Sequence, residues 1–407
     1  MKTTGDIQLL KRINRSVLLR LMLNSPGLSR ARLAAQSGLT KSTVSGLVRE
    51  LIDEHWLVEA DSTVAAEGMG RPSTPLHVDS NARVLIGIEI AVECLRLVCV
   101  SVTGAILSET EAPLNNSQPE PVCTQVARLV QKLCVQLQAK GLLLSGVGVC
   151  LPGAINDESG IVRLAPNLEW RNVAFLPLIA AAFSKAGVPP TQIHLQNDAD
   201  AAALGEYEFG ESDGDDPLIF INCDVGVGAG IVLNDRLFTG SVGTAGEIGH
   251  TILQINGPLC SCGRSGCAET FIGSRFLRKK ADLEAAGQYL GVLIQNLDAM
   301  FNPRVLVLGG RSCVNNPGLV ETARQTLLSY AQGAGLPAPE VRSARYGLQA
   351  AAVGAAALVL HRFLRPMLVG AYVETGASRS TESLAPQLKT TALQKRLLDE
   401  PPHVLRH

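Results

Sequence analysis

One histidine and three cysteines lie within eighteen residues of this chain and have the spacing of a metal site. The sequence runs Gly249-His250, nine more residues, and then Cys260-Ser261-Cys262-Gly263-Arg264-Ser265-Gly266-Cys267. One imidazole and three thiolates suit tetrahedral zinc, and four protein ligands leave no open position for a catalytic water. We therefore predict one structural Zn²⁺ per chain, held by His250, Cys260, Cys262 and Cys267. A set of unrelated buried thiols is the alternative, which the clustering and the intervening glycines disfavour.

The same stretch carries a family resemblance. Glu247-Ile248-Gly249-His250, followed by C-x-C-G-x-x-G-C-x-E ending at Glu269, resembles the signature of the ROK family of sugar kinases and sugar-responsive repressors. The resemblance spans roughly residues 14–365 and implies an α/β fold of the actin/hexokinase-like (ribonuclease H-like) kind, with its zinc loop at 249–269. The chain departs from the family between Phe271 and Gly287, where relatives have a larger helical insertion that shapes subunit contacts.

The resemblance also implies where a sugar would bind. The positions that match the family's sugar pocket are Asn167, Asn197, Asp198, Glu247, His250 and Glu269. Asp198 matches the kinase base, and in a protein without phosphoryl transfer its carboxylate would orient sugar hydroxyls instead. His250 would present one ring nitrogen to zinc and the other to the sugar. Taken singly, Asp198 could be a helix N-cap, Asn167 a turn residue and Glu269 a solvated helix start.

The two turns that would hold ATP in a kinase of this fold are altered. Glu89-Ile90-Ala91-Val92-Glu93 stands where a kinase has D-x-G-G-T, so both glycines and the hydroxyl are absent. In the second half, G-T-G-x-G-G-G becomes Asp224-Val225-Gly226-Val227-Gly228-Ala229-Gly230. Phosphoryl transfer depends on positioning and on electrostatic stabilisation of the phosphates. We therefore expect a sugar-binding cleft without catalysis, with a sugar kinase carrying an appended regulatory domain as the alternative.

The first fifty residues form a basic segment with helical periodicity. Residues 1–49 contain nine Lys or Arg and one acid, Asp6, although the whole chain has a net charge of −1. Such an end suits a polyanion. An apolar stripe at 17–22, a helix at 30–37 between Ser29 and Gly38, and a third helix from Thr40 to about Ile52 predict a helix-turn-helix. A solvated helical hairpin that caps the next domain is the alternative.

A small β-wing is predicted after these helices, from strands at 56–60 and 75–78. Its tip contains a G-x-G-R-P stretch that resembles the wing of ROK repressors. The last helix would read the major groove and the wing arginine a narrow minor groove. The predicted DNA contacts are Arg30, Lys41, Ser42, Thr43, Ser45, Arg49, Gly70 and Arg71.

Two similar runs of strands and helices follow, which predicts a duplicated α/β domain. The first run has strands at 84–90, 95–102 and 106–107, a helix at 121–140 and a strand at 146–150. The second has strands at 218–223, 229–233 and 236–238, then a helix at 283–301, a strand at 304–308 and a helix at 348–360. We divide the chain into a winged helix-turn-helix domain at 1–80, an effector domain at 81–366 with halves at 81–215 and 216–366, and a poorly ordered tail at 367–407.

Composition limits the remaining possibilities. No run of eighteen apolar residues occurs although 46% of the chain is hydrophobic, and the N-terminus has no apolar signal region. The ten cysteines read as reduced thiols. We therefore predict a cytoplasmic transcriptional regulator with no membrane span, a repressor of carbohydrate genes that responds to a sugar or sugar phosphate. Symmetric operator DNA implies a homo-oligomer, a dimer or tetramer. Control by a protein partner, such as a phosphotransferase-system component, stays open.

Overall fold

The fold is taken from a computed structural model that describes residues 7–60, 74–210, 215–241, 243–277, 280–366 and 373–374. The predicted wing tip with Gly70 and Arg71, and nearly all of the predicted tail at 367–407, lie outside the described residues.

The basic segment folds as the three predicted helices. They are α1 (Ile7–Asn24), α2 (Arg30–Ser37) and α3 (Lys41–Asp53). The Ser29 and Thr40 side chains accept hydrogen bonds from the first turns of α2 and α3, and Gly38 ends α2 with a φ of 71°. Strands β1 (Leu57–Glu59) and β2 (Leu76–Val78) pair antiparallel. The predicted caps and both wing strands are therefore confirmed.

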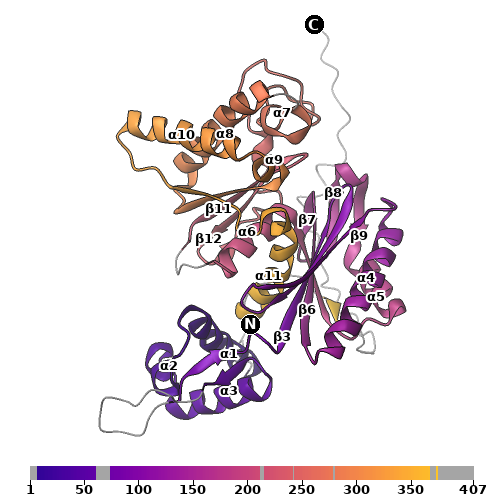
Figure 1. The fold of residues 1–407 in the computed structure, drawn as a ribbon, viewed down its shortest axis with the longest axis vertical. Helices are drawn as coiled ribbons and strands as arrows, with labels where there is room; N and C mark the ends of the chain where they lie inside the picture. Colours follow the sequence, from indigo (N-terminus) through magenta and orange to yellow (C-terminus); the bar gives the residue numbers. More distant parts are fainter. Residues whose placement is uncertain are drawn as a thin grey trace, which may run out of the picture. The chain divides into compact units, whose positions relative to one another are not determined.

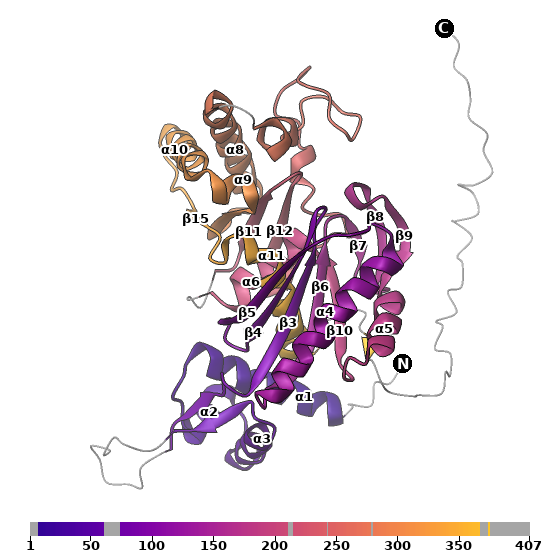
Figure 2. The same cartoon turned by 45° about the vertical axis from the view of Figure 1, so that its right-hand side comes forward.

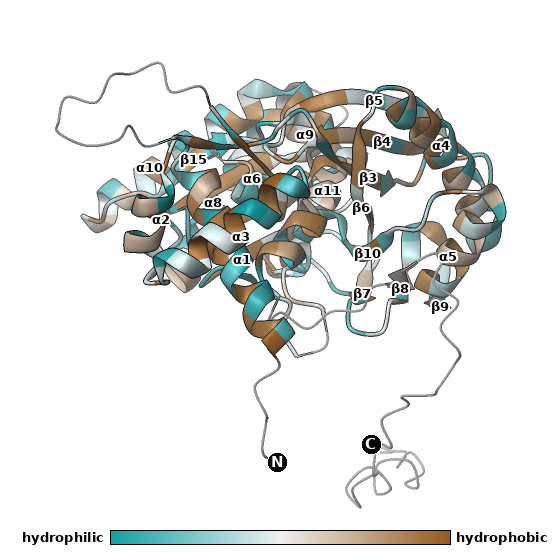
Figure 3. Ribbon diagram, turned by 90° about the horizontal axis from the view of Figure 1, so that it is seen from below, coloured by the Kyte–Doolittle hydropathy of each residue, from teal (hydrophilic) through white to brown (hydrophobic). Residues whose placement is uncertain are grey.

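A six-stranded sheet, called here the first sheet, follows the wing. Its strands are β3 (Arg83–Ile90), β4 (Cys94–Ser101), β5 (Ile106–Pro113), β6 (Leu143–Leu151), β10 (Gln192–Asn197) and β16 (Val373–Glu374). Their order is β16-β10-β6-β3-β4-β5, with β3, β6 and β10 parallel. Figure 3 shows β3 and β4 as largely hydrophobic, because both faces of the sheet are covered.

Helices pack on both faces of the first sheet. Helices α4 (Pro119–Ala139) and α5 (Phe175–Ala186) cover one face, as Figure 2 shows, and α11 (Ala350–Leu364) covers the other. Val373–Glu374 pairs antiparallel with β10. The rest of the predicted tail lies outside the described residues, so its poor order stays a prediction.

The second sheet repeats the topology of the first (Figure 1). Its strands are β11 (Leu218–Cys223), β12 (Val227–Leu233), β13 (Arg236–Leu237), β14 (Val305–Gly309) and β15 (Glu340–Ser343). In both sheets an antiparallel meander lies on one side of the first strand and parallel strands lie on the other. Helices α8 (Lys280–Phe301) and α10 (Pro317–Ala334) cover one face, and α6 (Asp198–Glu208) packs on the other. The predicted duplicated α/β fold is confirmed.

Helix α11 lies against the first sheet at two glycines. A Cβ atom at Gly87 would lie 1.8 Å from the carbonyl oxygen of Ala352, and one at Gly148 would lie 1.7 Å from that of Ala355. The backbone of α11 therefore contacts the backbone of β3 and β6 directly. The window Gly347–Leu364 is the one helix within the described ranges that is long and apolar enough to cross a membrane, and 72% of it is buried inside the protein. This burial is that of a core helix.

Several short elements were not predicted. Strands β7 (Ala154–Asn156), β8 (Ile161–Ala165) and β9 (Trp170–Ala174) form a separate antiparallel sheet that includes the turn η1 (Pro166–Leu168). The turn η2 (Ile248–His250) precedes the zinc loop, and α7 (Glu269–Ile272) and η3 (Ser274–Phe276) follow it. The short helix α9 (Gly310–Asn315) begins directly after β14.

Candidate effector, metal and DNA sites

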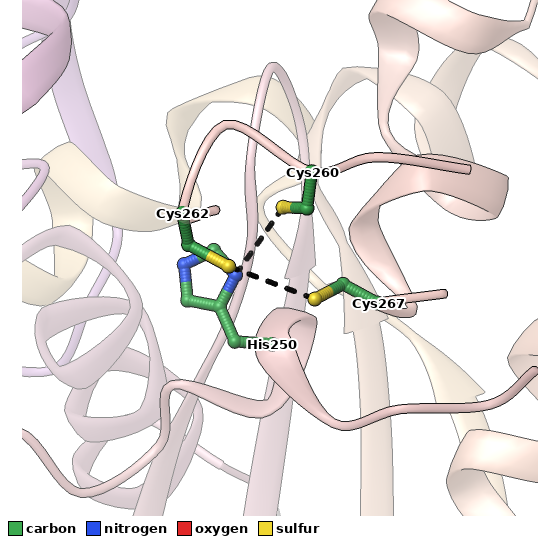
Figure 4. A group of neighbouring side chains, drawn as sticks. All are labelled: His250, Cys260, Cys262 and Cys267. Atoms are coloured by element: carbon green, nitrogen blue, oxygen red, sulfur yellow. Dashed lines mark hydrogen bonds between the residues drawn. The ribbon is translucent and has the colours of Figure 1, made fainter. Parts of the chain in front are cut away.

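The structure brings the four predicted metal ligands together (Figure 4). Their ligand atoms all lie within 4.8 Å of one another, in His250, Cys260, Cys262 and Cys267. The Sγ atoms of Cys262 and Cys267 are 3.7 Å apart, and Sγ of Cys260 is 3.7 Å from Nδ1 of His250. A tetrahedron with zinc–sulfur bonds of about 2.3 Å has edges of about 3.8 Å, so these separations fit a zinc ion.

The metal loop folds back on itself through two isolated β-bridges. They join Ile252 to Cys267 and Leu259 to Ser265. At Gly266, where φ is 77°, a Cβ atom would lie 1.7 Å from the carbonyl oxygen of Gln254. Only glycine fits there, and this position sets the last cysteine beside the others.

The candidate effector carboxylate, Asp198, lies at the start of α6. The N-cap is the preceding residue, Asn197, whose side-chain oxygen accepts from the backbone N–H groups of Ala199 and Asp200 at 2.8 and 3.2 Å. Its amide also donates to the carbonyl of Gly153 at 3.0 Å. The N-cap of α6 is therefore Asn197 and not Asp198. Asp198 is the first helical residue, and its side chain is half-buried.

Asp198 lies among other acids. Its Oδ2 accepts from the amide of Asn222 at 3.4 Å. Burial raises the pKa of Asp198 to about 6, the backbone N–H of Ala199 opposes this rise, and the charges of Asp224 and Glu247 add to it. Burial likewise raises the pKa of Glu247, with His250 opposing the shift. A neutral ligand rich in hydroxyls would give these carboxyl groups hydrogen-bond partners without adding charge.

Glu269 joins this acidic group to the metal loop. Its Oε1 lies 3.9 Å from Sγ of Cys260, and its Oε2 accepts from the backbone N–H of Val227 at 3.3 Å. Glu269 also acts on the pKa of Glu247 through its charge. The solvated-start interpretation of Glu269 therefore does not describe its contacts, since the side chain turns toward the second sheet and the metal ligands.

Asn167 connects to this region through an arginine that the sequence did not single out. Asn167 is exposed in η1, and its side-chain oxygen accepts from Arg275 at 3.4 Å. Arg275 lies in η3, shortly after Glu269. The contact links the small third sheet to the region beside α7.

The two altered phosphate turns are joined by an arginine. Arg311 donates to Asp224 at 2.8 Å and to Glu93 at 3.3 Å, so it bonds to residues from both turns. Glu89 is buried and accepts from Arg96 at 3.0 Å. Burial raises the pKa of Glu89 to about 7, although Arg96 opposes the shift.

A small pocket open to solvent lies between these turns and the start of α11. Its polar wall consists of Glu89, Arg96, Asn222, Asp224 and Arg311. Two arginines of the protein therefore bind the carboxylates of the altered turns: Arg96 binds Glu89, and Arg311 binds Glu93 and Asp224.

The predicted DNA-contacting residues on α2 and α3 fall into two groups, those whose side chains are exposed without an acidic partner and those that already have a partner within the protein. Lys41, Ser42, Ser45 and Arg49 are exposed on α3, and no acidic partner contacts Lys41 or Arg49 among the described residues. Arg30 instead pairs with Glu59 at 2.5 Å, and the hydroxyl of Thr43 is 2.9 Å from that of Thr40.

Comparison with known proteins agrees with this geometry. The model of the ROK family matches residues 85–286 and 278–362, and that of the IclR helix-turn-helix domain matches residues 16–61. The chain belongs to the ROK family. It is 30% identical to the xylose repressor of Caldicellulosiruptor bescii over 366 residues, 79% of this chain and 89% of the relative. It is 27% identical to the xylose repressor of Bacillus subtilis over 385 residues, 88% of this chain and 98% of the relative.

A solved structure shares the whole architecture. The crystal structure of a ROK family transcriptional regulator, a homologue of the Escherichia coli Mlc protein, aligns with a TM-score of 0.72 at 24% identity, covering 88% of this chain and 98% of that one. The ROK fold and the helix-turn-helix domain, together with the repressor relatives, support a sugar-responsive DNA-binding repressor.

Some side-chain contacts at these sites were not predicted from the sequence of this ROK chain. Asn222, Arg275 and Arg311 each reach a predicted residue from a distant segment. Of these, Arg311 alone follows a Gly-Gly pair, and such a pair after a strand is a common turn that does not mark the arginine.

Proposed function

We propose that this chain is a cytoplasmic repressor of sugar-utilisation genes, which binds operator DNA through residues 1–80 and releases it when a sugar binds residues 81–366. One observation carries the proposal. A helix-turn-helix whose last helix exposes Lys41 and Arg49, with no acidic partner among the described residues, is joined to a ROK fold in which Arg311 bridges the two altered turns. Within 367–407, only 373–374 has a described place, in the first sheet.

The proposed DNA surface consists of α3 and the wing. Lys41 and Arg49 are free to bind phosphates or base edges, and Ser42 and Ser45 add small hydroxyl groups suited to the major groove. Gly70 and Arg71 would contribute from the wing. Lys11, Arg15 and Arg20 instead form ion pairs within the protein. The DNA contacts therefore concentrate on α3 and the wing.

The proposed effector is a neutral sugar or a sugar phosphate bound by Asn167, Asn197, Asp198, Glu247, His250 and Glu269. Carboxylates accept hydrogen bonds from sugar hydroxyls and fix their orientation. Asn197 would act through its cap of α6, since its side chain already bonds the backbone. Xylose is the first ligand to test, because two relatives are named xylose repressors.

We further propose one structural zinc per chain, held by His250, Cys260, Cys262 and Cys267. The ion would neutralise three thiolates and hold the loop from which Glu269 extends. Metal analysis of the purified protein should find one zinc per chain. Cys262→Ser should lose the ion, whereas Cys94→Ser, at a half-buried cysteine outside the cluster, should retain it. A wild-type protein free of zinc contradicts this part of the proposal.

Phosphoryl transfer is not part of the proposal. A nucleotide would have to displace Arg311 from Glu93 and Asp224, and both carboxylates would then face its phosphates. ATP-dependent phosphorylation of xylose or of common hexoses, at a turnover of roughly 1–100 per second, would replace the repressor with the kinase alternative.

The test of function is operator binding. A mobility shift on the promoter DNA of the chain's own locus should show salt-sensitive binding. Arg49→Ala should weaken it by roughly 5- to 100-fold, the equivalent of about 1–3 kcal/mol. Arg128→Ala, an exposed cation on α4, is the matched control and should bind as the wild type does. Unchanged affinity in both Arg49→Ala and Arg71→Ala would exclude α3 and the wing as the DNA surface.

The same preparation tests the signal and the assembly. Xylose should weaken operator binding, and light scattering should find a dimer or tetramer, as two-fold operator symmetry requires. Sugar binding that leaves operator affinity unchanged would favour a protein partner as the signal.

A further inference from the structure

One aspartate, Asp235, lies at the tip of the hairpin between β12 and β13. Asn234 and Asp235 have φ angles of 52° and 66°, as in the tight two-residue turns of β-hairpins. The Asp216 carboxylate accepts from the backbone N–H groups of both residues, at 2.9 and 2.6 Å. The tip is therefore held firmly at the end of the second sheet.

Three donors from three helices meet at the Asp235 carboxylate. Arg20 of α1 donates at 2.7 Å and Tyr207 of α6 at 2.8 Å, and Arg365, which follows α11, also bonds to it. Burial alone would raise the pKa of Asp235, but the bonds from Arg365 and Tyr207 hold it below its usual value. The carboxylate is thus an anion whose two oxygens are shared by three donors.

The same helix that reaches Asp235 begins at the proposed effector site. Helix α6 starts at Asp198 and ends with Tyr207 and Glu208. Its eleven residues span about 16 Å at 1.5 Å per residue. Glu208 accepts from Arg365 at 2.5 Å and is paired with His361 at 2.6 Å, which ties the end of α6 to the end of α11.

The interface between α6 and α11 is made of backbone and small residues. A Cβ atom at Gly205 would lie 3.0 Å from Cα of Gly354, and one at Gly354 would lie 1.9 Å from the carbonyl oxygen of Ala201. Backbone atoms of the two helices are therefore in direct contact there, and small sliding movements of packed helices are one of the ways in which proteins change conformation. Because a helix moves as a unit, a shift at Asp198 reaches Tyr207.

The helix-turn-helix is attached to the rest of the chain in a second way. Arg83, at the start of the first sheet, donates to the carbonyl of Glu54 at 2.7 Å and lies over the ring of Trp56 at 4.7 Å. Trp56 stacks on Phe363 of α11, with ring centroids 4.4 Å apart. The ion pair of Arg20 with Asp235 thus joins the DNA-binding helices to the second sheet, while these other contacts join them to the first.

We propose that the Arg20–Asp235 ion pair transmits effector binding from α6 to the DNA-binding helices. This inference rests on the proposed function. A ligand at Asp198 moves α6, Tyr207 and Arg365 change their hold on the shared carboxylate, and Arg20 with α1 responds. The ligand needs only to bind more tightly to one of two conformations, one with the Arg20–Asp235 ion pair formed and one with it broken.

The experiment separates coupling from binding. Operator affinity is measured by fluorescence anisotropy, with and without xylose, for the wild type, Arg20→Gln, Asp235→Asn and the double variant. Effector affinity is measured by calorimetry. Lys11→Gln is the control, because Lys11 lies on the same helix but pairs with Glu50 of α3. Hydrogen exchange of the α1 amides, measured without ligand, tests the contact by itself.

The expected result is a loss of the effect of xylose on operator affinity without a loss of xylose binding. Xylose should weaken operator binding by roughly 5- to 150-fold in the wild type and in Lys11→Gln, and by less than about twofold in Arg20→Gln and Asp235→Asn. Each variant should still bind xylose. Exchange in α1 should rise alike in both single variants and no further in the double variant.

Two results would overturn the inference: full coupling retained in Arg20→Gln, or α1 exchange that Asp235→Asn leaves unchanged. If xylose affects no protein, including the wild type, the proposed effector is at fault, and the exchange measurement still decides whether Asp235 holds α1.

Discussion

The proposed sugar contact of Asp198 would come at a cost to the stability of the fold. Its carboxyl group is placed at the start of α6 among Asp224, Glu247 and Asn222, and its pKa is raised to about 6. The raised pKa means that the fold destabilises the charged carboxylate relative to the unfolded chain. At neutral pH the charged form still predominates, and it is the form that accepts hydroxyl hydrogen bonds most strongly, so the fold bears this cost.

Asp198 should therefore make stability depend on pH. Between the unfolded pKa of 3.8 and the folded value of about 6, the native state binds more protons than the unfolded state, so stability falls as pH rises. Asp198→Asn should remove that part of the slope and, at pH 7, raise the free energy of unfolding by on the order of 2 kcal/mol, while abolishing xylose binding. Urea unfolding at pH 4, 5, 6 and 7 is the measurement. A variant whose pH slope equals that of the wild type would show that Asp198 does not carry this shift.

Single residues were predictable where local spacing carries the chemistry. The four metal-ligand candidates lie close together in sequence, and the structure brings them together. Asn222, Arg275 and Arg311 were missed because each acts on a residue 24 to 108 positions away, and no periodicity marks such a contact. The sugar contacts of all six pocket residues stay predictions, and the side chain of Asn197 already bonds the backbone.

At the level of helices and strands, most elements with a clear apolar pattern or a cap were predicted, but the helices α5, α6 and α10 were not. The N-terminal helices have caps at Ser29 and Thr40 that fix where they begin. Strands buried on both faces, such as β3 and β11, read as apolar runs. The short strands β7, β8 and β16 were missed because so few residues carry no alternating pattern. The equally short strands β1 and β2 were predicted because they follow the helix-turn-helix as a wing would.

The packing of α6 on α11 allows a prediction about one glycine. Gly354→Ala should force the helices apart, since its new methyl group would lie 1.9 Å from the carbonyl oxygen of Ala201. We expect a destabilisation of at least about 2 kcal/mol, measured by urea unfolding. Gly333→Ala on α10 is the control, because open space surrounds Gly333, and it should stabilise by about 0.5–1 kcal/mol. Similar stability for the two variants would contradict the close approach of α6 and α11.

In the whole molecule, charged residues near the two altered turns join the first sheet to the second. Glu93 lies between β3 and β4 of the first sheet, Asp224 follows β11 of the second, and Arg311 lies in α9, which begins directly after β14. Arg311 thus attracts the two sheets to each other without ATP. The loss of phosphate binding expected from Glu93 and Asp224 stays a prediction, and the arginine that both carboxylates share is visible only in the fold.

Removing this cation should loosen the two sheets by a modest amount. Arg311→Met leaves Glu93 and Asp224 as uncompensated like charges, so a conformation with the sheets further apart gains population. Partly exposed ion pairs contribute only about 0.2–1 kcal/mol each, and Arg311 makes two of them, so xylose affinity should fall by no more than about 30-fold. Small-angle scattering should report a larger radius of gyration, and calorimetry the weaker binding.

Neutralising the two acids separates charge repulsion from lost packing. The variant Arg311→Met with Glu93→Gln and Asp224→Asn should regain most of the wild-type xylose affinity, because no like charges remain. Arg324→Met, which removes a cation paired with Glu321 inside α10, should behave as the wild type does. If the triple variant binds xylose as weakly as Arg311→Met, the arginine acts through its packing, and the electrostatic link between the sheets is refuted. Recovery would establish that the protein's own charges hold together two halves that a kinase of this fold would join through nucleotide.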